Sequence, residues 1–228
     1  MSARLDTVWD HIRRAREKMN PGRVIDVGSD HGLTAIASLS CNAATSVVCT
    51  DINEGPAAIC KDNLREAGCS DRAEVFVTDG LDGIKLEPED IIVISGLGGL
   101  NTIDILGRAF NDNDKSVLER VTLVLQPQKS IEDMRRFLRN NRLVITDETA
   151  VKDSGFHYVV VTASYGKDDS LLSDIEYAYL GPVLIDKYKQ GDPATSEYYE
   201  FLARMLDIRA RSNDECREAE KKLRSILE

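Results

Sequence analysis

The 228-residue sequence lacks the features of several protein classes. No apolar run approaches the roughly 20 residues that a membrane-spanning helix needs, and charged residues make up 30% of the chain. The N-terminal stretch mixes acidic with basic residues and has neither a continuous apolar segment nor a small-residue cleavage site. It does not look like a secretory signal, so we expect a soluble, cytoplasmic protein without a membrane partner.

Paired cysteines and an excess of positive charge are also missing. The cysteines are odd in number and form no Cys-x-x-Cys pair; they are Cys41, Cys49, Cys60, Cys69 and Cys216. This pattern argues against structural zinc and against a disulfide framework, so we expect no metal. The formal net charge is -10. Because phosphate binding needs local Lys and Arg, this balance argues against a nucleic-acid footprint over the whole surface, but not against a local basic face.

Short β-rich runs alternate with amphipathic stretches, which is typical of βαβ units and a mostly parallel sheet. Five near-continuous apolar runs are predicted to be strands covered by helices on both faces: Arg23–Val27, Ser46–Asp51, Ala73–Thr78, Ile91–Ser95 and Thr122–Leu125. Two further strands, Arg142–Ala150 and Tyr158–Ser164, are joined by a polar turn too short for a helix. The seventh strand should therefore run antiparallel beside its predecessor, which completes a seven-stranded α/β fold.

Amphipathic helices are predicted over Leu5–Lys18, Gly55–Ala67 and Ile131–Asn140, the last with Ser130 as its cap. The C-terminal part reads as a short helix, Val183–Lys189, and a charged helix of about 30 residues from near Ser196. Along the long helix, residues at alternating steps of three and four form a narrow coiled-coil-like seam: Phe201, Met205, Ile208, Ser212, Cys216, Ala219, Leu223 and Ile226. We therefore divide the chain into a first domain, residues 1–172, and a C-terminal helical, coiled-coil-like hairpin, residues 173–228.

The turn after the first strand is a candidate ligand site. Asp26, Gly28 and Gly32 have the spacing Asp-x-Gly-x-x-x-Gly, and Asp30 stands where a dinucleotide fingerprint needs its second glycine. A carboxylate there would repel a pyrophosphate and argues against NAD. A cationic ligand without phosphate, such as S-adenosylmethionine, would tolerate it. A tight strand-to-helix turn in another α/β fold stays open as the alternative.

Acidic residues also end the second and third strands. Asp51 follows Gly28 by about 23 residues, where a carboxylate can accept hydrogen bonds from both ribose hydroxyls. Asp79 precedes Gly80 and Leu81, where methyltransferases commonly place an acid against the adenine amino group. Each acid alone is typical of a turn, but three at one sheet edge favour a ligand site, since open α/β sheets bind ligands at the carboxyl ends of strands.

A glycine-rich loop, Ser95-Gly96-Leu97-Gly98-Gly99, follows the fourth strand. Its glycines leave exposed amides and space beside a methyl donor, and they equally suit a strand-to-helix turn with positive φ. The Asn- or Asp-Pro-Pro-aromatic loop of many methyltransferases that modify amino nitrogens does not occur here.

The order of these motifs resembles that of the TrmK-type bacterial tRNA adenine N1-methyltransferases, class I enzymes that modify adenine 22. The matching segments cover nearly the whole chain: Gly28–Gly32, Asn53–Pro56, Ser95–Gly99, Leu123–Gln128, Gly155–Tyr158 and Leu180–Pro182. The resemblance implies a Rossmann-like methyltransferase domain followed by a helical, coiled-coil C-terminal domain. It also implies that S-adenosylmethionine methylates N1 of an adenine in tRNA and leaves as S-adenosylhomocysteine.

The resemblance assigns roles to individual residues. It implies that Asp30 is catalytic; capping the next helix or binding the donor's amino group is the alternative. The residues that it implies for donor binding are Asp26, Gly28, Ser29, His31, Asp51, Ile52, Asp79, Gly80, Leu81, Ser95, Gly96, Leu97 and Gly98. Those implied for target binding are Gly99, Gln126, Pro127, Gln128, His157 and Tyr158. Ser95, Leu97, Gln128 and Asp51 depart from the family's Ala-Gly-Met-Gly-Gly, Gln-Pro-Asn and Glu.

Two basic clusters could contact tRNA phosphates or form solvated helix faces: Arg13, Arg14, Arg16 and Lys18, and Arg135, Arg136, Arg139 and Arg142. We expect tRNA as the partner, and a monomer or a weak homodimer through the C-terminal helices. Two alternatives stay open: a methyltransferase that acts on a small molecule or protein, and a non-catalytic donor-binding or scaffolding protein.

Overall fold

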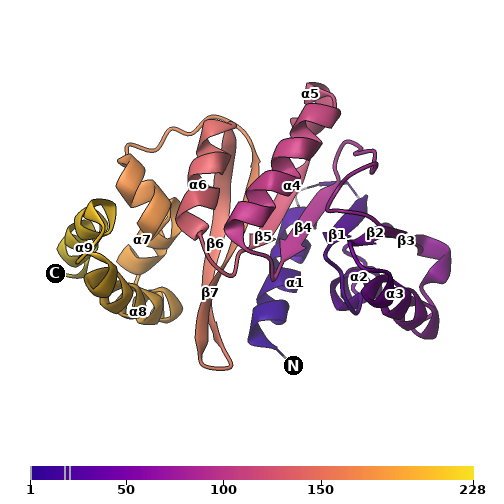
Figure 1. Cartoon of the computed structure of the whole chain (residues 1–228), viewed down its shortest axis with the longest axis horizontal. Coiled ribbons are helices and arrows are strands. Elements are labelled where there is room, and N and C mark those ends of the chain that lie inside the picture. Colours follow the sequence, from indigo (N-terminus) through magenta and orange to yellow (C-terminus); the bar gives the residue numbers. More distant parts are fainter. Residues whose placement is uncertain (1, 18, 21) are drawn as a thin grey trace.

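A computed structural model describes residues 2–17, 19–20 and 22–228, and its centre is one seven-stranded sheet (Figure 1). The strands are β1 (Arg23–Val27), β2 (Ser46–Asp51), β3 (Ala73–Val77), β4 (Ile91–Ser95), β5 (Thr122–Gln126), β6 (Leu143–Asp153) and β7 (Phe156–Tyr165). Their order is β3-β2-β1-β4-β5-β7-β6. The first five pair in parallel, and β7 pairs antiparallel with both β5 and β6. The predicted α/β class, with five parallel strands and a terminal hairpin, is confirmed.

Helices cover both faces of the sheet because the buried strands are apolar on both sides. On one face lie α1 (Ala3–Arg16), α2 (Leu33–Ser40) and α3 (Glu54–Glu66); on the other lie α4 (Gly99–Asp112) and α6 (Ile131–Asn140). Two short elements, the 3-10 turn η1 (Ser70–Arg72) and α5 (Lys115–Leu118), complete this part. The predicted helix 5–18 lies on α1, although Lys18 is outside the described residues. Ser130 occupies the N-cap position of α6 as predicted, but it adopts φ 56° and its side chain makes no capping hydrogen bond.

The C-terminal helices are η2 (Glu176–Leu180, a π-helical turn), α7 (Pro182–Lys189), α8 (Pro193–Arg209) and α9 (Asp214–Leu227), which lie beside β6 (Figure 1). The single helix predicted from near Ser196 is therefore wrong, because the chain turns between α8 and α9. The Asn213 side chain accepts a hydrogen bond from the Cys216 N–H and so starts α9. None of the helices in the described residues combines the length and the apolar composition of a membrane span.

The predicted coiled-coil seam is buried only along α9. Cys216, Ala219 and Leu223 belong to the same hydrophobic core as β4, β5 and α6. In α8, the seam residues Met205 and Ile208 are exposed, and Leu206, which was not predicted, is the buried residue. Because the C-terminal helices share this core, the division of the chain at residue 172 stays a prediction.

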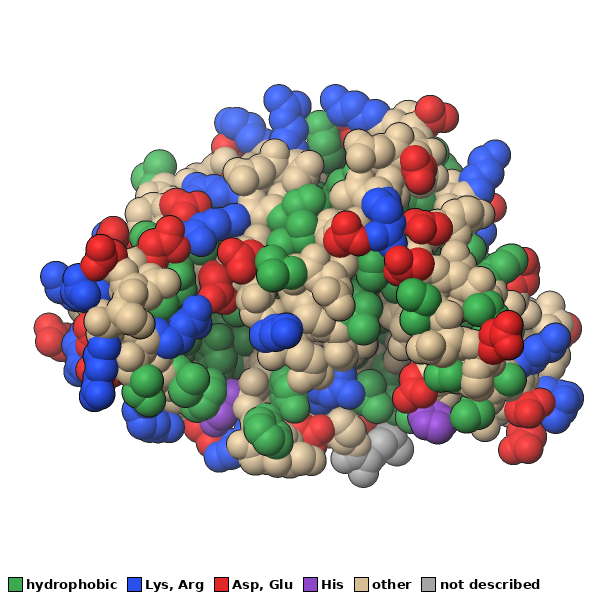
Figure 2. Space-filling model, in the orientation of Figure 1, with side chains coloured by type: hydrophobic (Ala, Val, Ile, Leu, Met, Phe, Trp, Pro, Cys, Tyr) green, Lys and Arg blue, Asp and Glu red, His purple; other side chains and the backbone are tan. Residues whose placement is uncertain are grey.

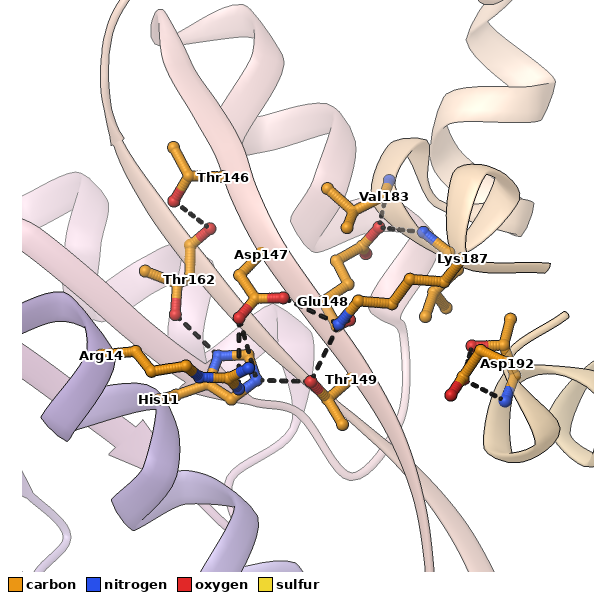
Figure 3. A network of polar contacts seen from close by, with 12 residues as sticks. His11, Arg14, Thr146, Asp147, Glu148, Thr149, Thr162, Val183, Lys187 and Asp192 are labelled. Atoms are coloured by element: carbon orange, nitrogen blue, oxygen red, sulfur yellow. Dashed lines mark hydrogen bonds and ion pairs between the residues drawn. The ribbon is translucent and has the colours of Figure 1, made fainter. Parts of the chain in front are cut away.

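A polar network ties α1, β6 and α7 together (Figure 3). A bulge in β6 precedes Asp147 and Glu148, which point to opposite faces. Asp147 forms ion pairs with Arg14 of α1 (3.2 Å) and Lys187 of α7 (2.9 Å). Burial of His11, whose two ring nitrogens contact threonine hydroxyls, lowers its pKa to about 4. The N-terminal helix and the C-terminal helices are thus joined through the edge strand.

Candidate active site

The loops after β1, β2 and β3, together with the loop after β4 and the start of α4, enclose a cavity of about 530 Å³ at the carboxyl edge of the sheet. The predicted donor residues on its wall are Gly28, Asp51, Ile52, Asp79, Gly80 and Leu97. Lining residues that the sequence did not single out for this site are Val27, Asn53, Asn101, Asp104 and Ile105. The volume suits a small organic ligand with several polar groups.

The turn after β1 depends on three residues with positive φ: Gly28 (69°), Asp30 (46°) and Gly32 (70°). A Cβ on Gly32 would lie 2.8 Å from the Cys60 Sγ, so this position accepts no side chain without movement. Asp30 is a non-glycine residue in the left-handed region, a conformation that often marks functional sites.

Thr50 holds the walls of the cavity together, and the sequence analysis missed it. Its carbonyl accepts hydrogen bonds from the N–H groups of Gly28 (2.8 Å) and Ser29 (3.0 Å). Its hydroxyl donates to the Gly80 carbonyl at 2.8 Å. This buried residue therefore connects the turns that follow β1 and β3, and it also fixes Ser29, which is buried and does not line the cavity.

Acidic groups surround the cavity. Asp51 accepts a hydrogen bond from the Asn53 N–H at 2.9 Å, which orients its carboxylate. Asp79 forms an ion pair with Arg108 of α4 at 3.2 Å. Arg108 also contacts Asp82 and Asp104, and the hydrogen bond to Asp82 is the largest cause of its raised pKa. A single guanidinium thus holds several of the acids on this rim.

Two other predicted donor residues lie behind the wall. Asp26 is fully buried, and its carboxyl accepts a hydrogen bond from the Ala35 N–H. Burial raises the pKa of Asp26 to about 7. Leu81 belongs to the hydrophobic core. Neither residue lines the cavity.

Asp30 and His31 project from the turn into solvent. The Asp30 side chain is 66% exposed and that of His31 54%, with 3.6 Å between the His31 Nε2 and an Asp30 carboxylate oxygen. The Asn63 side chain donates a hydrogen bond to the His31 carbonyl at 2.9 Å, which attaches the turn to α3. Neither residue lines the cavity, and the Asp30 carboxylate is open to solvent.

The loops after β4 and β5 are hydrogen-bonded to each other. Gly96 N–H donates to the Gln126 carbonyl (3.1 Å), Gln128 N–H to the Leu97 carbonyl (2.8 Å) and Gly99 N–H to the Lys129 carbonyl (2.8 Å). A Cβ on Gly99 would overlap the Ser130 carbonyl oxygen. The glycine at position 99 thus permits close approach of two backbones. Of the other residues predicted here, Gly96 is exposed, and Ser95 and Gly98 are half-buried.

The Gln126 amide is turned into the protein. Its side chain is almost fully buried; Oε1 accepts a hydrogen bond from Arg4 (2.7 Å), and Nε2 donates to the Pro127 carbonyl (3.0 Å). Pro127 is buried and Gln128 is exposed. Of this trio, only the Gln128 side chain is open to an incoming base. Arg4, near the N-terminus, is a neighbour of Gln126 that the sequence analysis did not predict.

The two residues of β7 that were predicted to bind the target, His157 and Tyr158, face different partners. The His157 ring stacks on Phe201 of α8, with 4.5 Å between ring centroids, and burial lowers the pKa of His157. The Arg4 guanidinium lies over the Tyr158 ring, with 5.9 Å between the Arg4 Cζ and the ring centroid. Tyr158 is therefore on the α1 side of the hairpin, and His157 is on the α8 side.

Comparison with known proteins identifies the family. The family model described as tRNA (adenine(22)-N(1))-methyltransferase, TrmK, matches residues 24–227. The chain belongs to this family. The expected membership of the TrmK-type tRNA adenine N1-methyltransferases is confirmed.

Individual members show the same relationship. The tRNA (adenine(22)-N(1))-methyltransferase of Bacillus subtilis (strain 168) is 27% identical over 218 residues, which cover 91% of this chain and 87% of that protein. A provisionally named tRNA methyltransferase of Mycoplasma pneumoniae is 31% identical over 189 residues, 82% of each chain.

Solved structures confirm the Rossmann-like methyltransferase fold with its C-terminal helices. Sp1610 of Streptococcus pneumoniae, solved in complex with S-adenosyl-L-methionine, superimposes with a TM-score of 0.82 at 22% identity, over 100% of both chains. The Bacillus subtilis m1A22 tRNA methyltransferase TrmK gives a TM-score of 0.77 at 22% identity, over 99% of this chain and 94% of that one. At this level of identity the likeness concerns the fold.

Most arginines of the two predicted basic clusters form ion pairs or hydrogen bonds within the protein. Arg13 pairs with Asp10 and Glu17, and Arg16 donates to backbone carbonyls. In the second cluster, Arg135 pairs with Glu148. Arg136 pairs with Asp174 and Glu215, and Arg139 pairs with Asp168. On the face of the molecule seen in Figure 2, basic and acidic side chains are interspersed. Among the described residues, no group of three or more His, Cys, Asp and Glu side chains could hold a metal ion.

Proposed function

We propose that this chain transfers the methyl group of S-adenosylmethionine to N1 of an adenine in tRNA, and that adenine 22 is the target. One observation carries the proposal. In a chain that the family model matches over residues 24–227, a cavity of about 530 Å³ lies at the carboxyl edge of the sheet, with Asp51 and Asp79 on its wall. The Streptococcus pneumoniae relative of the same fold was solved with S-adenosyl-L-methionine, which supports this donor.

The cavity wall suits the donor. Asp51, already oriented by Asn53, can accept hydrogen bonds from the ribose hydroxyls. Asp79 can accept from the adenine amino group, and the absence of a side chain at Gly28 lets the ligand approach the backbone. The acidic rim favours a ligand with a sulfonium cation. We assign Asp26, Ser29 and Leu81 to supporting the wall, because they lie behind it.

The chemistry needs alignment more than acid-base catalysis. The N1 lone pair attacks the methyl carbon as the carbon–sulfur bond breaks, and that bonding pair stays on sulfur. N1 becomes cationic while the sulfonium charge disappears. The protein must align N1, methyl and sulfur, and stabilise positive charge on the purine. Asp30 is exposed, two residues beyond Gly28 of the cavity wall, and we assign its carboxylate to stabilising that charge.

The target side carries features that fit RNA. Lys129 is exposed beside the glycine-rich loop, with its side chain 3.2 Å from where a Gly98 Cβ would lie. Such a lysine can contact a phosphate next to the target nucleotide. We keep both a monomer and a weak homodimer through the C-terminal helices, since the seam residues of α9 are buried inside the chain whereas Met205 and Ile208 of α8 are exposed. A cytoplasmic location is part of the same proposal, since it is where tRNA is modified.

The test is methyl transfer from isotopically labelled S-adenosylmethionine to unmodified bacterial tRNA, followed by digestion and identification of the labelled nucleoside. Labelled 1-methyladenosine at position 22 supports the proposal. Donor binding without RNA labelling would instead favour a small-molecule or protein substrate. If the protein does not bind the donor at all, the proposed function fails and only the fold assignment stands.

Asp30→Asn tests the catalytic assignment. We expect kcat to fall about 100-fold while donor affinity changes little, because a lost transition-state contact acts on kcat. Asp62→Asn is the matched control, since Asp62 is an exposed acid of α3 that pairs with Arg65. Equal kcat in both variants would remove Asp30 from the mechanism.

A further inference from the structure

Arg4 brings a positive charge from α1 to the carboxyl ends of β4 and β5. Its Nη1 donates to the Ser95 hydroxyl at 3.0 Å and to the Gln126 Oε1 at 2.7 Å. Ser95 and Gln126 are register partners at the last paired positions of the two strands. One guanidinium thus joins the N-terminal helix to both strand ends that border the target side.

Strand periodicity explains why these groups meet. Val93, Val124 and Val160 share a core with Val8 and Ile12 of α1. Alternate residues of a strand point to the same face, so the residues two positions nearer the carboxyl edge also face α1. Because β7 runs antiparallel, those residues are Ser95, Gln126 and Tyr158. The hydroxyl, the amide and the ring therefore converge on Arg4.

Arg4 differs from Arg13 and Arg14 of the same helix. Arg13 and Arg14 form ion pairs with acidic residues. Within the part of the chain that the structure describes, no Asp or Glu oxygen lies within 4.0 Å of the Arg4 guanidinium. A hydroxyl, an amide oxygen and the Tyr158 ring surround it instead. The Arg4 charge lies beside the glycine-rich loop, and it interacts at longer range with Asp153, whose pKa it helps to lower.

The start of α1 is held in place on the hairpin. The Ser2 hydroxyl donates to the Asp153 carboxylate at 2.6 Å, and this hydrogen bond is the largest cause of the lowered pKa of Asp153. Backbone N–H groups of Ala3 and Arg4 donate to the same carboxylate. Asp153 thus acts at the positive end of the helix and fixes where the Arg4 side chain begins.

We propose that Arg4 is a positioning residue for the target adenine, and this rests on the proposed function. It holds the Gln126 amide and the Ser95 hydroxyl in one orientation, and so shapes the target side of the site together with Tyr158. A guanidinium in direct contact with the base would oppose formation of cationic 1-methyladenine. Arg4 therefore acts through its neighbours and not on the reacting nitrogen.

The test compares Arg4→Ala, Arg4→Lys and Gln126→Ala, singly and as the double variant Arg4→Ala/Gln126→Ala, in steady-state methylation of tRNA. We expect Arg4→Ala to lower kcat about 10- to 100-fold, because small misplacements of a reacting group have effects of this size. Arg4→Lys should restore part of kcat, since an ammonium keeps the charge and at least one of the hydrogen bonds. Arg120→Ala is the control and should keep the wild-type rate, because Arg120 is an exposed arginine before β5 that pairs with Glu89.

Two further readouts separate positioning from a merely structural role. Donor affinity should stay within about 3-fold of wild type in Arg4→Ala, because the donor cavity does not include Arg4. The double variant should be no slower than the slower single variant, since residues that act as a unit have non-additive effects. A wild-type kcat in Arg4→Ala, or fully additive losses in the double variant, would show that Arg4 is not a positioning residue. Neither result would contradict the proposed function. If wild-type protein makes no 1-methyladenosine, the proposed function itself fails, and the role of Arg4 fails with it.

Discussion

Removing the buried guanidinium of Arg135 should strongly destabilise the protein. Arg135 and Glu148 are both 0% exposed and form an ion pair at 2.8 Å. Arg135 also donates to the carbonyls of Ala178 (2.9 Å) and Tyr179 (3.3 Å), and Glu148 accepts from the Val183 N–H at 3.0 Å. The pair therefore connects α6 and β6 to the C-terminal helices.

The expected magnitude follows from burial. Arg135→Ala leaves the Glu148 carboxylate buried without its partner, a change that costs about 3–5 kcal/mol of unfolding free energy. For a chain of this size each kcal/mol lowers Tm by about 2–4 °C, so Tm should fall by roughly 6–20 °C. Urea unfolding gives the free energy, and a thermal scan gives Tm.

Two controls sharpen this test. Arg136→Ala removes a neighbouring guanidinium whose partners, Asp174 and Glu215, are more than half exposed. It should cost about 1 kcal/mol or less, because exposed ion pairs contribute little. The double variant Arg135→Met/Glu148→Leu should be less destabilised than Arg135→Ala, since no buried charge is left unpaired. A loss below about 1 kcal/mol in Arg135→Ala would refute the reasoning.

Three further predictions concern the site. Asp26 has a folded-state pKa of about 7 against an ordinary 3.8, so its stabilising contribution falls as pH rises through that window. Relative to Asp26→Asn, the unfolding free energy of wild type should drop by about 2 kcal/mol between about pH 5 and pH 7, and a pH-independent difference in urea unfolding would contradict this. Gly99→Ala should cost about 1–3 kcal/mol by forcing the Ser130 carbonyl away, and an unchanged Tm would show that the loop yields freely. Asp51→Ala should weaken donor binding about 10- to 100-fold in calorimetric titration, and wild-type affinity would exclude the ribose contact.

The parallel strands could be predicted from sequence because each is a short apolar run between turn residues. β1, β2 and β4 have the predicted bounds, and β5 ends one residue later. The break between α8 and α9 was missed because two exposed apolar residues of α8, Met205 and Ile208, continue the spacing of the buried residues of α9. Asn213, which caps α9, was the available signal.

The candidate site was only partly predictable. Motifs at strand ends indicated Gly28, Asp51 and Asp79, since topology alone brings those positions to one sheet edge. The same motifs did not predict the orientation of the side chains. Asp26 and Gln126 belong to the same motifs, yet both point into the protein.

By itself, then, the sequence determined the fold class, the family and the sheet edge at which the site lies, because these depend on local hydrophobic patterns and on motifs of neighbouring residues. Only the tertiary structure decided which polar groups meet. Arg4 reaches residues 91 and 122 positions away, and Arg135 is paired inside the core instead of facing RNA. Such contacts depend on how distant elements pack, and no local pattern encodes them.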